Sequence, residues 1–289
     1  MKADFGVVIL TMGRRPDELA SAVQSLRAQQ GVSLDVVIVG NGWDPATKFP
    51  NEKTLHLLEN LGIPAGRNAG TKEVEGEFYF FLDDDVLLHD PKTLAKMKQL
   101  FDERAEIGLI QPRVMALVDG DTTPKRWIPR LRVGDEHQSS VATSLWEGAT
   151  AIRSELFERV GGWPSNFFYA HEGIELVWRT LDQGFLPWYA AEIEVKHPVI
   201  DPARHEYYFF LNARNRVWLA RRNLRFPFSF LYPLTWMLVS LIRIRSGKNL
   251  KASFMGFFQG TFTHAGSTPG KLHWKTHLAL TRFGRPPII

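Results

Sequence analysis

The sequence predicts an α/β protein with a mainly parallel central sheet, followed by a helical C-terminal region. Short apolar runs rich in β-branched residues alternate with segments of helical periodicity up to about residue 200. Polar or glycine-rich turns follow these runs, which is typical of βαβ units. Beyond residue 204 the pattern becomes helical, aromatic and basic. We therefore expect one α/β domain over residues 1–203 and a helical region over 204–289.

The first part of the chain is expected to supply most of the sheet. Residues 5–10 and 34–39 form short buried-strand patterns, and the second pattern stops at Gly40-Asn41-Gly42. Apolar residues at helical spacing, after a proline suited to a first helical turn, predict a helix over 16–29. Further strands are expected at 78–82 and within 108–118, and further helices at 68–74 and 91–104.

The second part begins with a polar, turn-rich stretch over 119–145, which we expect to be a long loop. A short helix over 154–160 should end at Gly161-Gly162, and a longer helix over 172–183 should end at Gly184. Residues 185–196 are expected to return as a strand before the helical region begins.

The composition suits a globular protein that buries a sizeable core, with 289 residues of which 44% are hydrophobic and 23% charged. The absence of cysteine excludes disulfides, thiolate catalysis and cysteine-ligated zinc. The N-terminus lacks the pattern of a signal peptide, which is a basic flank, then an apolar stretch, then a cleavage site of small residues. A cytoplasmic location is therefore the expectation.

The net charge of +4 hides a strong asymmetry. Residues 1–200 carry 21 Lys and Arg against 29 Asp and Glu, whereas residues 201–289 carry 14 against two. This split indicates either a region that meets an anionic partner or a solvated basic face. Aromatic residues in the basic region fit a helix core better than a base-stacking platform, so we expect no nucleic-acid partner.

An apolar run over 226–242 lies inside this basic region. It is short for a membrane span and contains Pro227 and Pro233, and cations follow it up to Lys251. Three interpretations stay open: peripheral contact of 226–251 with the inner face of a membrane, packing on the α/β domain, or an interface in a homo-oligomer.

Ligands of open α/β sheets bind beyond the carboxyl ends of the strands, and three polar segments are expected there. They are residues 11–14, 40–42 and 83–85. On an extended backbone Asp83 and Asp85 would project to the same side. Two such carboxylates suit Mg²⁺ or Mn²⁺ bound together with substrate phosphates. The alternative is a solvated acidic turn that caps the next helix.

Three further features carry candidate chemistry. The glycine-rich stretch over 60–70 contains Arg67 and enters a helix, so it could meet an anion or be only a turn. Glu172 and Glu175 lie near a helix start, where a carboxylate could act as a general base or simply complement the helix dipole. His197 follows a strand and could ligate a metal or be structural.

Together these segments resemble the family 2 glycosyltransferases, which are inverting enzymes with the Rossmann-like GT-A fold. The resemblance covers about residues 5–225. The stretch 60–70 resembles the family's NxG…GxxRNxG segment, Phe80-Phe81-Leu82-Asp83-Asp84-Asp85 its DxD motif, and residues 169–179 its E-D-x-D-L-x-x-R helix. Residues 148–153 with 160–163 resemble the block before the acceptor site, and His197 falls at the position of a metal-binding histidine.

The resemblance implies a role for each of these positions. The chain would transfer a hexosyl or deoxyhexosyl unit from a nucleoside-diphosphate sugar to a hydroxyl of a glycan, lipid-linked or small-molecule acceptor, with Mn²⁺ or Mg²⁺. Residues 1–118 would form the nucleotide-sugar half and 119–203 the acceptor half. Glu172, or failing it Glu175, would be the base, and Asp85, Asp83 and His197 would hold the metal. The nucleotide would contact Thr11, Arg14, Asn41, Arg67, Asn68, Asp83 and Asp84, and the acceptor Trp146, Gly148 and His171.

Two departures from the family pattern bear on this expectation. Gly40 stands where the family commonly has an aspartate that contacts the base, and Gly173 stands at the second position of the E-D pair, the usual base position. Two rival functions therefore remain. One is a nucleotidyltransferase, which also combines aspartates, a metal and a glycine-rich loop, and the other is a nucleotide-sugar binding module without activity.

Overall fold

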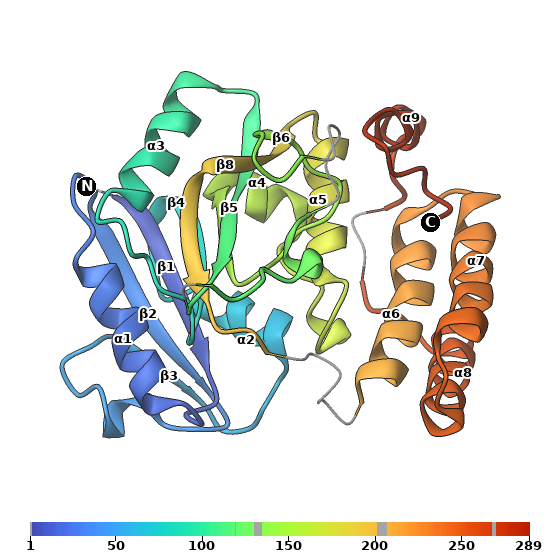
Figure 1. Ribbon diagram of the computed structural model, residues 1–289, viewed down its shortest axis with the longest axis horizontal. Helices are drawn as coiled ribbons and strands as arrows, with labels where there is room; N and C mark the ends of the chain where they lie inside the picture. The colour runs from blue at the N-terminus through green and yellow to red at the C-terminus, as the bar shows by residue number, and fades with distance from the viewer. Residues whose placement is uncertain (1, 119, 130–134, 201–206, 268–269) are drawn as a thin grey trace.

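The computed structural model describes the chain except residues 1, 119, 130–134, 201–206 and 268–269. Within the described residues, one sheet has the strand order β3-β2-β1-β4-β7-β5-β8-β6 (Figure 1). Strands β7 and β6 run antiparallel to their neighbours and the other strands run in one direction, so the expected mainly parallel sheet is confirmed. The strands are β1 (Ala3–Thr11), β2 (Leu34–Asn41), β3 (Thr54–Leu57), β4 (Gly76–Asp83), β5 (Ile107–Ala116), β6 (Ser140–Val141), β7 (Ala149–Arg153) and β8 (Leu186–His197).

The register of the central strands brings the candidate segments to one edge. Thr11 at the end of β1 pairs with Gly40 of β2, and the preceding Leu10 pairs with Asp83 of β4. These carboxyl ends lie along the lower edge of the sheet in Figure 1. The edge is where open α/β sheets place their ligands.

Helices cover both faces of the sheet and bury apolar stripes against it. On one face Leu19, Val23 and Leu26 of α1 join Phe5 and Phe78 in a buried cluster to which α3 contributes as well. The other face carries α2, α4 and α5. The bounds of these helices are α1 (Pro16–Arg27), α2 (Ile63–Gly70), α3 (Thr93–Glu103), α4 (Ser154–Val160) and α5 (Glu172–Asp182).

Helix α2 differs from the expected helix over 68–74, because it begins at Ile63 inside the glycine-rich stretch. Pro64 stands in its first turn, where a missing N–H costs nothing. A Cβ on Gly66 would lie 2.5 Å from Leu10 Cδ1, and one on Gly70 would lie 2.5 Å from Val8 Cγ1. The glycines thus allow a helix to pack closely on β1 and β2, and they do not form a loop.

Three strands were not expected from the sequence. Strands β3 and β7 are short, and β7 inserts antiparallel between the parallel strands β4 and β5. The stretch 119–145 also holds strand β6 and a 3₁₀ turn at Lys125–Trp127. Their pairing is set by distant partners, which local periodicity does not encode.

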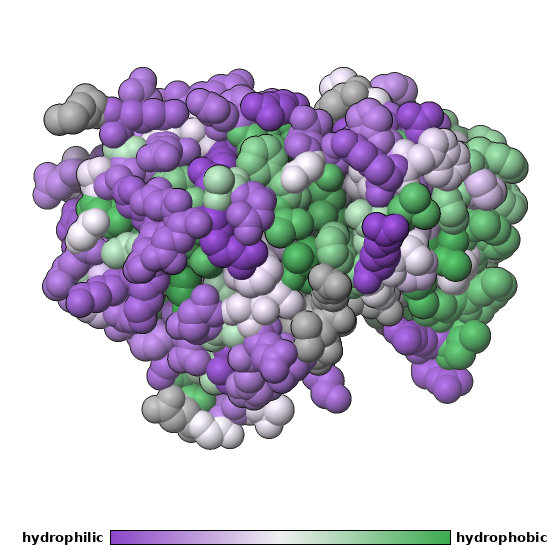
Figure 2. All heavy atoms as spheres, turned by 90° about the horizontal axis from the view of Figure 1, so that it is seen from above, coloured by the Kyte–Doolittle hydropathy of each residue, from purple (hydrophilic) through white to green (hydrophobic). Residues whose placement is uncertain are grey.

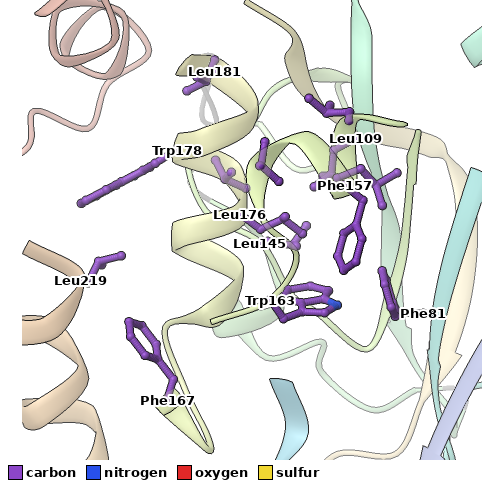
Figure 3. Packing of buried hydrophobic residues seen from close by; sticks show 14 of the residues in the cluster. Phe81, Leu109, Leu145, Phe157, Trp163, Phe167, Leu176, Trp178, Leu181 and Leu219 are labelled. Atoms are coloured by element: carbon purple, nitrogen blue, oxygen red, sulfur yellow. The ribbon is translucent and has the colours of Figure 1, made fainter. Parts of the chain in front are cut away.

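The C-terminal helices pack on the α/β domain through a shared hydrophobic core. Trp178 of α5 reaches towards Leu219 of α6, and Phe167 lies beside this contact (Figure 3). Tyr232 of α7 packs edge-on against Trp178, with ring centroids 5.7 Å apart. The expected boundary at 203/204 lies outside the described residues. The helices are α6 (Tyr208–Asn223), α7 (Phe228–Arg243), α8 (Gly247–Phe262) and α9 (Trp274–Arg282).

Across the described parts of the chain, no helix combines the length and the apolar character needed to cross a membrane.

Candidate active site

Arg15 joins two of the three aspartates after β4. Its Nη2 lies 2.6 Å from Asp84 Oδ1, and its Nη1 contacts Asp85 Oδ2. Thr11 Oγ1 also donates to Asp84 Oδ2 at 2.7 Å. Arg14, which the resemblance places at the nucleotide, is exposed. Sequence reasoning therefore found the segment but missed that Arg15 is the arginine that meets the acidic cluster.

The electrostatics of the two aspartates differ. Burial raises the pKa of Asp84 to about 6, although the Arg15 charge and the Thr11 hydrogen bond lower it. Burial also raises the pKa of Asp85, but the hydrogen bond and charge of His197, together with Arg15, outweigh burial and leave that pKa below its usual value. Asp85 is therefore the carboxylate that stays charged most readily.

Asp83 faces a different partner. Arg67, whose side chain is almost fully buried, donates from Nη2 to Asp83 Oδ1 at 2.7 Å. The guanidinium lies 5.2 Å from the ring centroid of Trp163. The strand ends at Asp83 and the chain turns there, so the alternation of an extended backbone does not continue to Asp85. Arg67 and Arg15 thus divide the aspartates between them.

His197 completes the edge of the site. Its Nε2 lies 3.3 Å from Asp85 Oδ1, and its ring is held edge-on by Trp127 and Trp146 at centroid distances of 4.8 and 5.2 Å. Its Nδ1 is buried, with no hydrogen-bond partner in the described residues. Asp85 and His197 accordingly present one oxygen and one nitrogen donor side by side.

The Asp85 and His197 pair fits a divalent cation that takes some of its ligands from the protein and the rest from the substrate. In the described residues no group of three or more His, Asp or Glu side chains is arranged to hold a metal. Asp83, assigned to the metal by resemblance, is paired with Arg67 instead. An ion that takes one or two protein ligands and completes its shell with phosphate oxygens and water needs no larger cluster. The residues present fit that kind of binding.

Two asparagines assigned to the nucleotide serve structural contacts. Asn41 donates from Nδ2 to Asn60 Oδ1 at 2.8 Å, and its Oδ1 accepts from the Leu61 N–H at 2.8 Å. Asn68 donates from Nδ2 to the Trp163 carbonyl at 2.7 Å and accepts from the Trp163 N–H at 3.0 Å. Both residues hold loops around the site rather than offering free polar groups to it.

Gly40 leaves no room for the aspartate that the family commonly has. A Cβ on Gly40 would lie 1.9 Å from the Trp43 carbonyl oxygen. The Trp43 ring in turn covers Gly13, whose φ is +68° and whose Cβ would lie 2.3 Å from that ring. This chain therefore shapes the region around the ends of β1 and β2 with Trp43, which sequence reasoning did not single out.

The carboxylates of α5 have unequal surroundings. Glu172 is 3% exposed, and burial together with the charge of Glu147 raises its pKa to about 8. Glu175 is enclosed: its oxygens accept from Arg222 Nη2 at 2.8 Å, Arg179 Nε at 3.3 Å and Asn223 Nδ2 at 3.0 Å. Glu172 thus interacts electrostatically with Glu147, whereas Glu175 joins α5 to α6.

The three residues assigned to the acceptor do not form one group. Trp146 stands against His197, and Gly148 makes room for it, because a Cβ there would lie 2.2 Å from the Trp146 ring. His171 lies on the side of the C-terminal helices, where burial and the charges of Arg216 and Arg285 lower its pKa well below 6.5.

Comparisons with known proteins agree with this geometry. The model of the family described as glycosyl transferase family 2 matches residues 7–161. The chain is 24% identical over 216 residues to the O-antigen biosynthesis protein RfbC of Myxococcus xanthus, a match that covers 66% of this chain and 17% of RfbC. The chain thus spans about a sixth of that relative.

Solved structures share the fold at low identity. The 1–349 fragment of S. aureus TarS superposes with a TM-score of 0.62 and 15% identity, covering 89% of this chain and 80% of the fragment. GalNAc-T7 with UDP, GalNAc and Mn²⁺ gives 0.64 and 12%, covering 90% and 56%. The mannosyltransferase PcManGT of Pyrobaculum calidifontis with GDP-Man and Mn²⁺ gives 0.55 and 16%, covering 93% and 77%. The resemblance drawn from the motifs is confirmed: the chain belongs to glycosyl transferase family 2 and is a glycosyltransferase with the GT-A fold.

Proposed function

We propose that the chain transfers a sugar from a nucleoside-diphosphate sugar to an acceptor hydroxyl with inversion at the anomeric carbon, assisted by a divalent cation. The observation that carries this proposal is the network of Arg15, Asp84, Asp85 and His197 at the carboxyl ends of β1, β4 and β8. It combines a guanidinium, which suits phosphate, with donors that suit a hard cation.

The diphosphate of the donor is expected at this network. Arg15 is bound to carboxylates on a partly exposed surface, so it can exchange them for phosphate oxygens when a cation neutralises the acids. UDP-GlcNAc in a TarS structure, UDP with GalNAc in the GalNAc-T7 structure and GDP-Man in the PcManGT structure support a donor of this class. Gly40 and Trp43 reshape the region where the family aspartate would stand, so the contact with the base differs from the family pattern.

Asp85 and His197 would hold the cation. When bound, Mn²⁺ or Mg²⁺ would neutralise part of the charge that develops on the departing diphosphate. Arg67, fixed beside Asp83 and buried against Trp163, orients that carboxylate on the inner side of the site. The protein residues thereby keep separate places for the cation and for the reacting sugar.

The acceptor is proposed to be lipid-linked and presented at a membrane surface. Apolar side chains gather at the end of the molecule formed by the C-terminal helices (Figure 2). On α7 and α8 these include Phe230, Leu238, Ile242, Met255, Phe258 and Phe262, each at least half exposed. An apolar groove of about 580 Å³ lies between α6 and α8, lined by Phe210, Phe254, Met255, Phe258 and Gln259.

The charge around this apolar surface favours anionic lipid over a second copy of the chain. Arg243, Arg245, Lys248 and Lys251 are exposed at the turn between α7 and α8, and the sequence has no Asp or Glu after Glu206. Two identical basic surfaces would repel each other, whereas cations beside an interfacial apolar face match anionic headgroups.

A panel of nucleotide sugars tests the proposed reaction. UDP-, GDP- and dTDP-linked sugars are incubated with the chain with and without Mn²⁺, and thermal shift and release of free nucleoside diphosphate are measured. We expect one donor class to raise the melting temperature and release its diphosphate, with Asp85→Asn abolishing the dependence on Mn²⁺. Asp102→Asn, on the exposed face of α3, is the control.

The product distinguishes the rival functions. A nucleotidyltransferase would release pyrophosphate or transfer the nucleotidyl group, with no free nucleoside diphosphate. A binding module would show the thermal shift without turnover. Inversion is read from the anomeric configuration of the first-formed product by NMR, and a retained configuration would contradict the proposed course.

A further inference from the structure

Residue 173 has no side chain, and the carboxylate of Glu147 fills the space beside it. A Cβ built on Gly173 would lie 2.3 Å from Glu147 Oε1 and 2.7 Å from Glu147 Cδ. The same Oε1 accepts the Gly173 N–H at 2.9 Å. The segment before β7 thus delivers a carboxylate to the first turn of α5, at the place a side chain of residue 173 would occupy.

The backbone on both sides of Glu147 is fixed. Gln111, which is fully buried, accepts the Trp146 N–H on its Oε1 at 2.7 Å. The Asp83 N–H donates to the Gly148 carbonyl at 2.8 Å. Glu147 is therefore tied directly to the end of β4 and stands next to the acidic edge of the site.

Glu147 and Glu172 interact electrostatically, and their carboxyl groups have different surroundings. Glu172 Oε2 is buried without a hydrogen-bond partner in the described residues, and burial and Glu147 raise the Glu172 pKa to about 8. Burial also raises the pKa of Glu147, while the Arg67 charge and the Gly173 N–H lower it. Glu147 Oε1 accepts the Gly173 N–H, whereas Glu172 Oε2 has no such donor, so hydrogen bonding favours the negative charge of the pair on Glu147.

We infer that Glu147 is the general base of the proposed transfer, in place of a side chain at position 173. In that step the acceptor hydroxyl gives its proton to a Glu147 oxygen while its oxygen bonds to the anomeric carbon. The bond from that carbon to the diphosphate breaks, and its electron pair leaves with the diphosphate. Glu172 acts as a positioning residue, since its neutral carboxyl keeps the negative charge of the pair on Glu147.

The other α5 carboxylate does not compete for this role. Glu175 is held by Arg222, Arg179 and Asn223, so abstraction of a proton would break a buried ion-pair network. Glu147 differs in being only partly buried. Glu147 is not part of the Glu175 network, so proton transfer to Glu147 breaks no ion pair between α5 and α6.

Glu147→Gln tests the inference, which rests on the proposed function. With the donor found in the panel, we expect diphosphate release to fall at least about 100-fold, a typical contribution of a general base, while donor binding stays within about twofold. The rate of the wild-type chain should rise with pH along a limb that Glu147→Gln lacks. Glu155→Gln, on the exposed face of α4, is the matched control.

A two-site exchange separates catalysis from structure. Gly173→Asp alone should lower the melting temperature, because its Cβ displaces the Glu147 side chain and its carboxylate adds a like charge beside Glu147 and Glu172. Combined with Glu147→Ala the aspartate has room, so the double variant should melt at a higher temperature than Gly173→Asp. It should also release diphosphate at least about 10-fold faster than Glu147→Ala, because a carboxylate is restored at the same place.

The possible outcomes distinguish this inference from the proposed function. Normal release by Glu147→Gln, or no recovery in a stably folded double variant, overturns the role of Glu147 while the transferase function stands. If the wild-type chain releases no diphosphate from any donor of the panel, the proposed function fails and the role of Glu147 fails with it.

Discussion

Arg15, just before α1, pairs with Asp84 and Asp85 and so places a positive charge beside the carboxylate that would hold a cation. Asp85 Oδ2 contacts Arg15, while Asp85 Oδ1 lies 3.3 Å from His197 Nε2. A divalent ion between Asp85 Oδ1 and His197 would stand beside the positive charge of Arg15, and it would weaken the pairing of Arg15 with Asp85. The same arginine becomes available to the phosphate groups that arrive with the ion.

This competition predicts a gain in metal affinity when Arg15 is lost. Arg15→Gln should bind Mn²⁺ about 10-fold more tightly than the wild-type chain in the absence of nucleotide, the equivalent of about 1.4 kcal/mol. Arg14→Gln, which removes an exposed neighbour, should leave the affinity within about twofold. Isothermal titration calorimetry with Mn²⁺ measures both. Weaker binding by Arg15→Gln would show that the guanidinium supports the site instead.

The raised pKa of Glu172 predicts a pH-dependent stability. Its carboxyl is neutral in the folded chain up to about pH 8 and ionises near 4.5 when unfolded, so the folded state holds the extra proton between these values. The free energy of unfolding should fall as pH rises through this range.

Glu172→Gln keeps a neutral side chain at every pH. Its melting temperature should exceed that of the wild type by a margin that grows by roughly 3 °C or more between pH 6 and pH 9, since about 1 kcal/mol corresponds to 2–4 °C in a domain of this size. Glu155→Gln should run parallel to the wild type. A constant margin for Glu172→Gln would contradict the assigned pKa.

At the scale of elements, the loop before α5 stores strain that α6 holds in place. Phe168, Ala170 and His171 have φ values of 65°, 72° and 71°, a left-handed conformation that is unfavourable for side chains of this kind. Asn215 of α6, fully buried, donates to the carbonyls of Phe167, Tyr169 and Ala170 at 3.0, 2.7 and 2.9 Å. The helix outside the family match thereby sets the start of α5 and the position of Glu172.

Asn215→Ala should therefore weaken both the fold and the site. Three carbonyls lose one shared donor, so we expect a loss of about 3 kcal/mol and a fall in melting temperature of roughly 6–12 °C. Diphosphate release should fall more than donor affinity does, because the loop leads to the carboxylates. Thr261→Ala, whose hydroxyl donates only within α8, should change neither. Equal stability of both variants would show that Asn215 does not hold the loop.

Some helices and strands of this fold could be predicted from the sequence, and others could not. Helices α1 and α4 and the central strands follow from apolar periodicity and from proline and glycine positions, because these act locally. The start of helix α2 was predicted too late, because its glycines suggested a loop. Their packing on β1 depends on tertiary contacts that the local sequence does not show. Strand β7 was missed because five residues carry little periodicity and both its partners are distant.

The candidate site was predictable in its location and less so in its members. Motif order placed Asp83 to Asp85, Arg67 and Glu172 near one sheet edge, which the register of β1 and β4 bears out for the aspartates. Glu147 could not be found, because only the antiparallel entry of β7 brings it to α5. A signal existed in Gly173: a glycine at the usual position of the base in the family motif calls for a carboxylate from elsewhere.

Over the whole molecule, charge and apolar surface are segregated. Acidic residues predominate in the sheet domain, and the C-terminal helices carry exposed apolar residues with a basic turn. In Figure 1 the C-terminal helices stand beside the sheet domain, and helix α6 begins near the level of the carboxyl ends of the strands. A surface that docks on a bilayer there would bring the site close to lipid-linked acceptors.

This arrangement predicts salt-sensitive binding to anionic vesicles. The chain should sediment with vesicles containing phosphatidylglycerol and much less with pure phosphatidylcholine, since each surface cation near anionic lipid contributes about 1 kcal/mol. Replacing Lys248 and Lys251 by Gln should weaken sedimentation about 10-fold or more and reduce its dependence on salt, while Phe258→Ser should weaken it at every salt concentration. Lys96→Gln on α3, an exposed lysine of the sheet domain, is the control. Binding independent of lipid charge, or a dimer in light scattering that Phe258→Ser dissociates without any vesicle binding by the wild type, would assign the surface to a second copy of the chain instead.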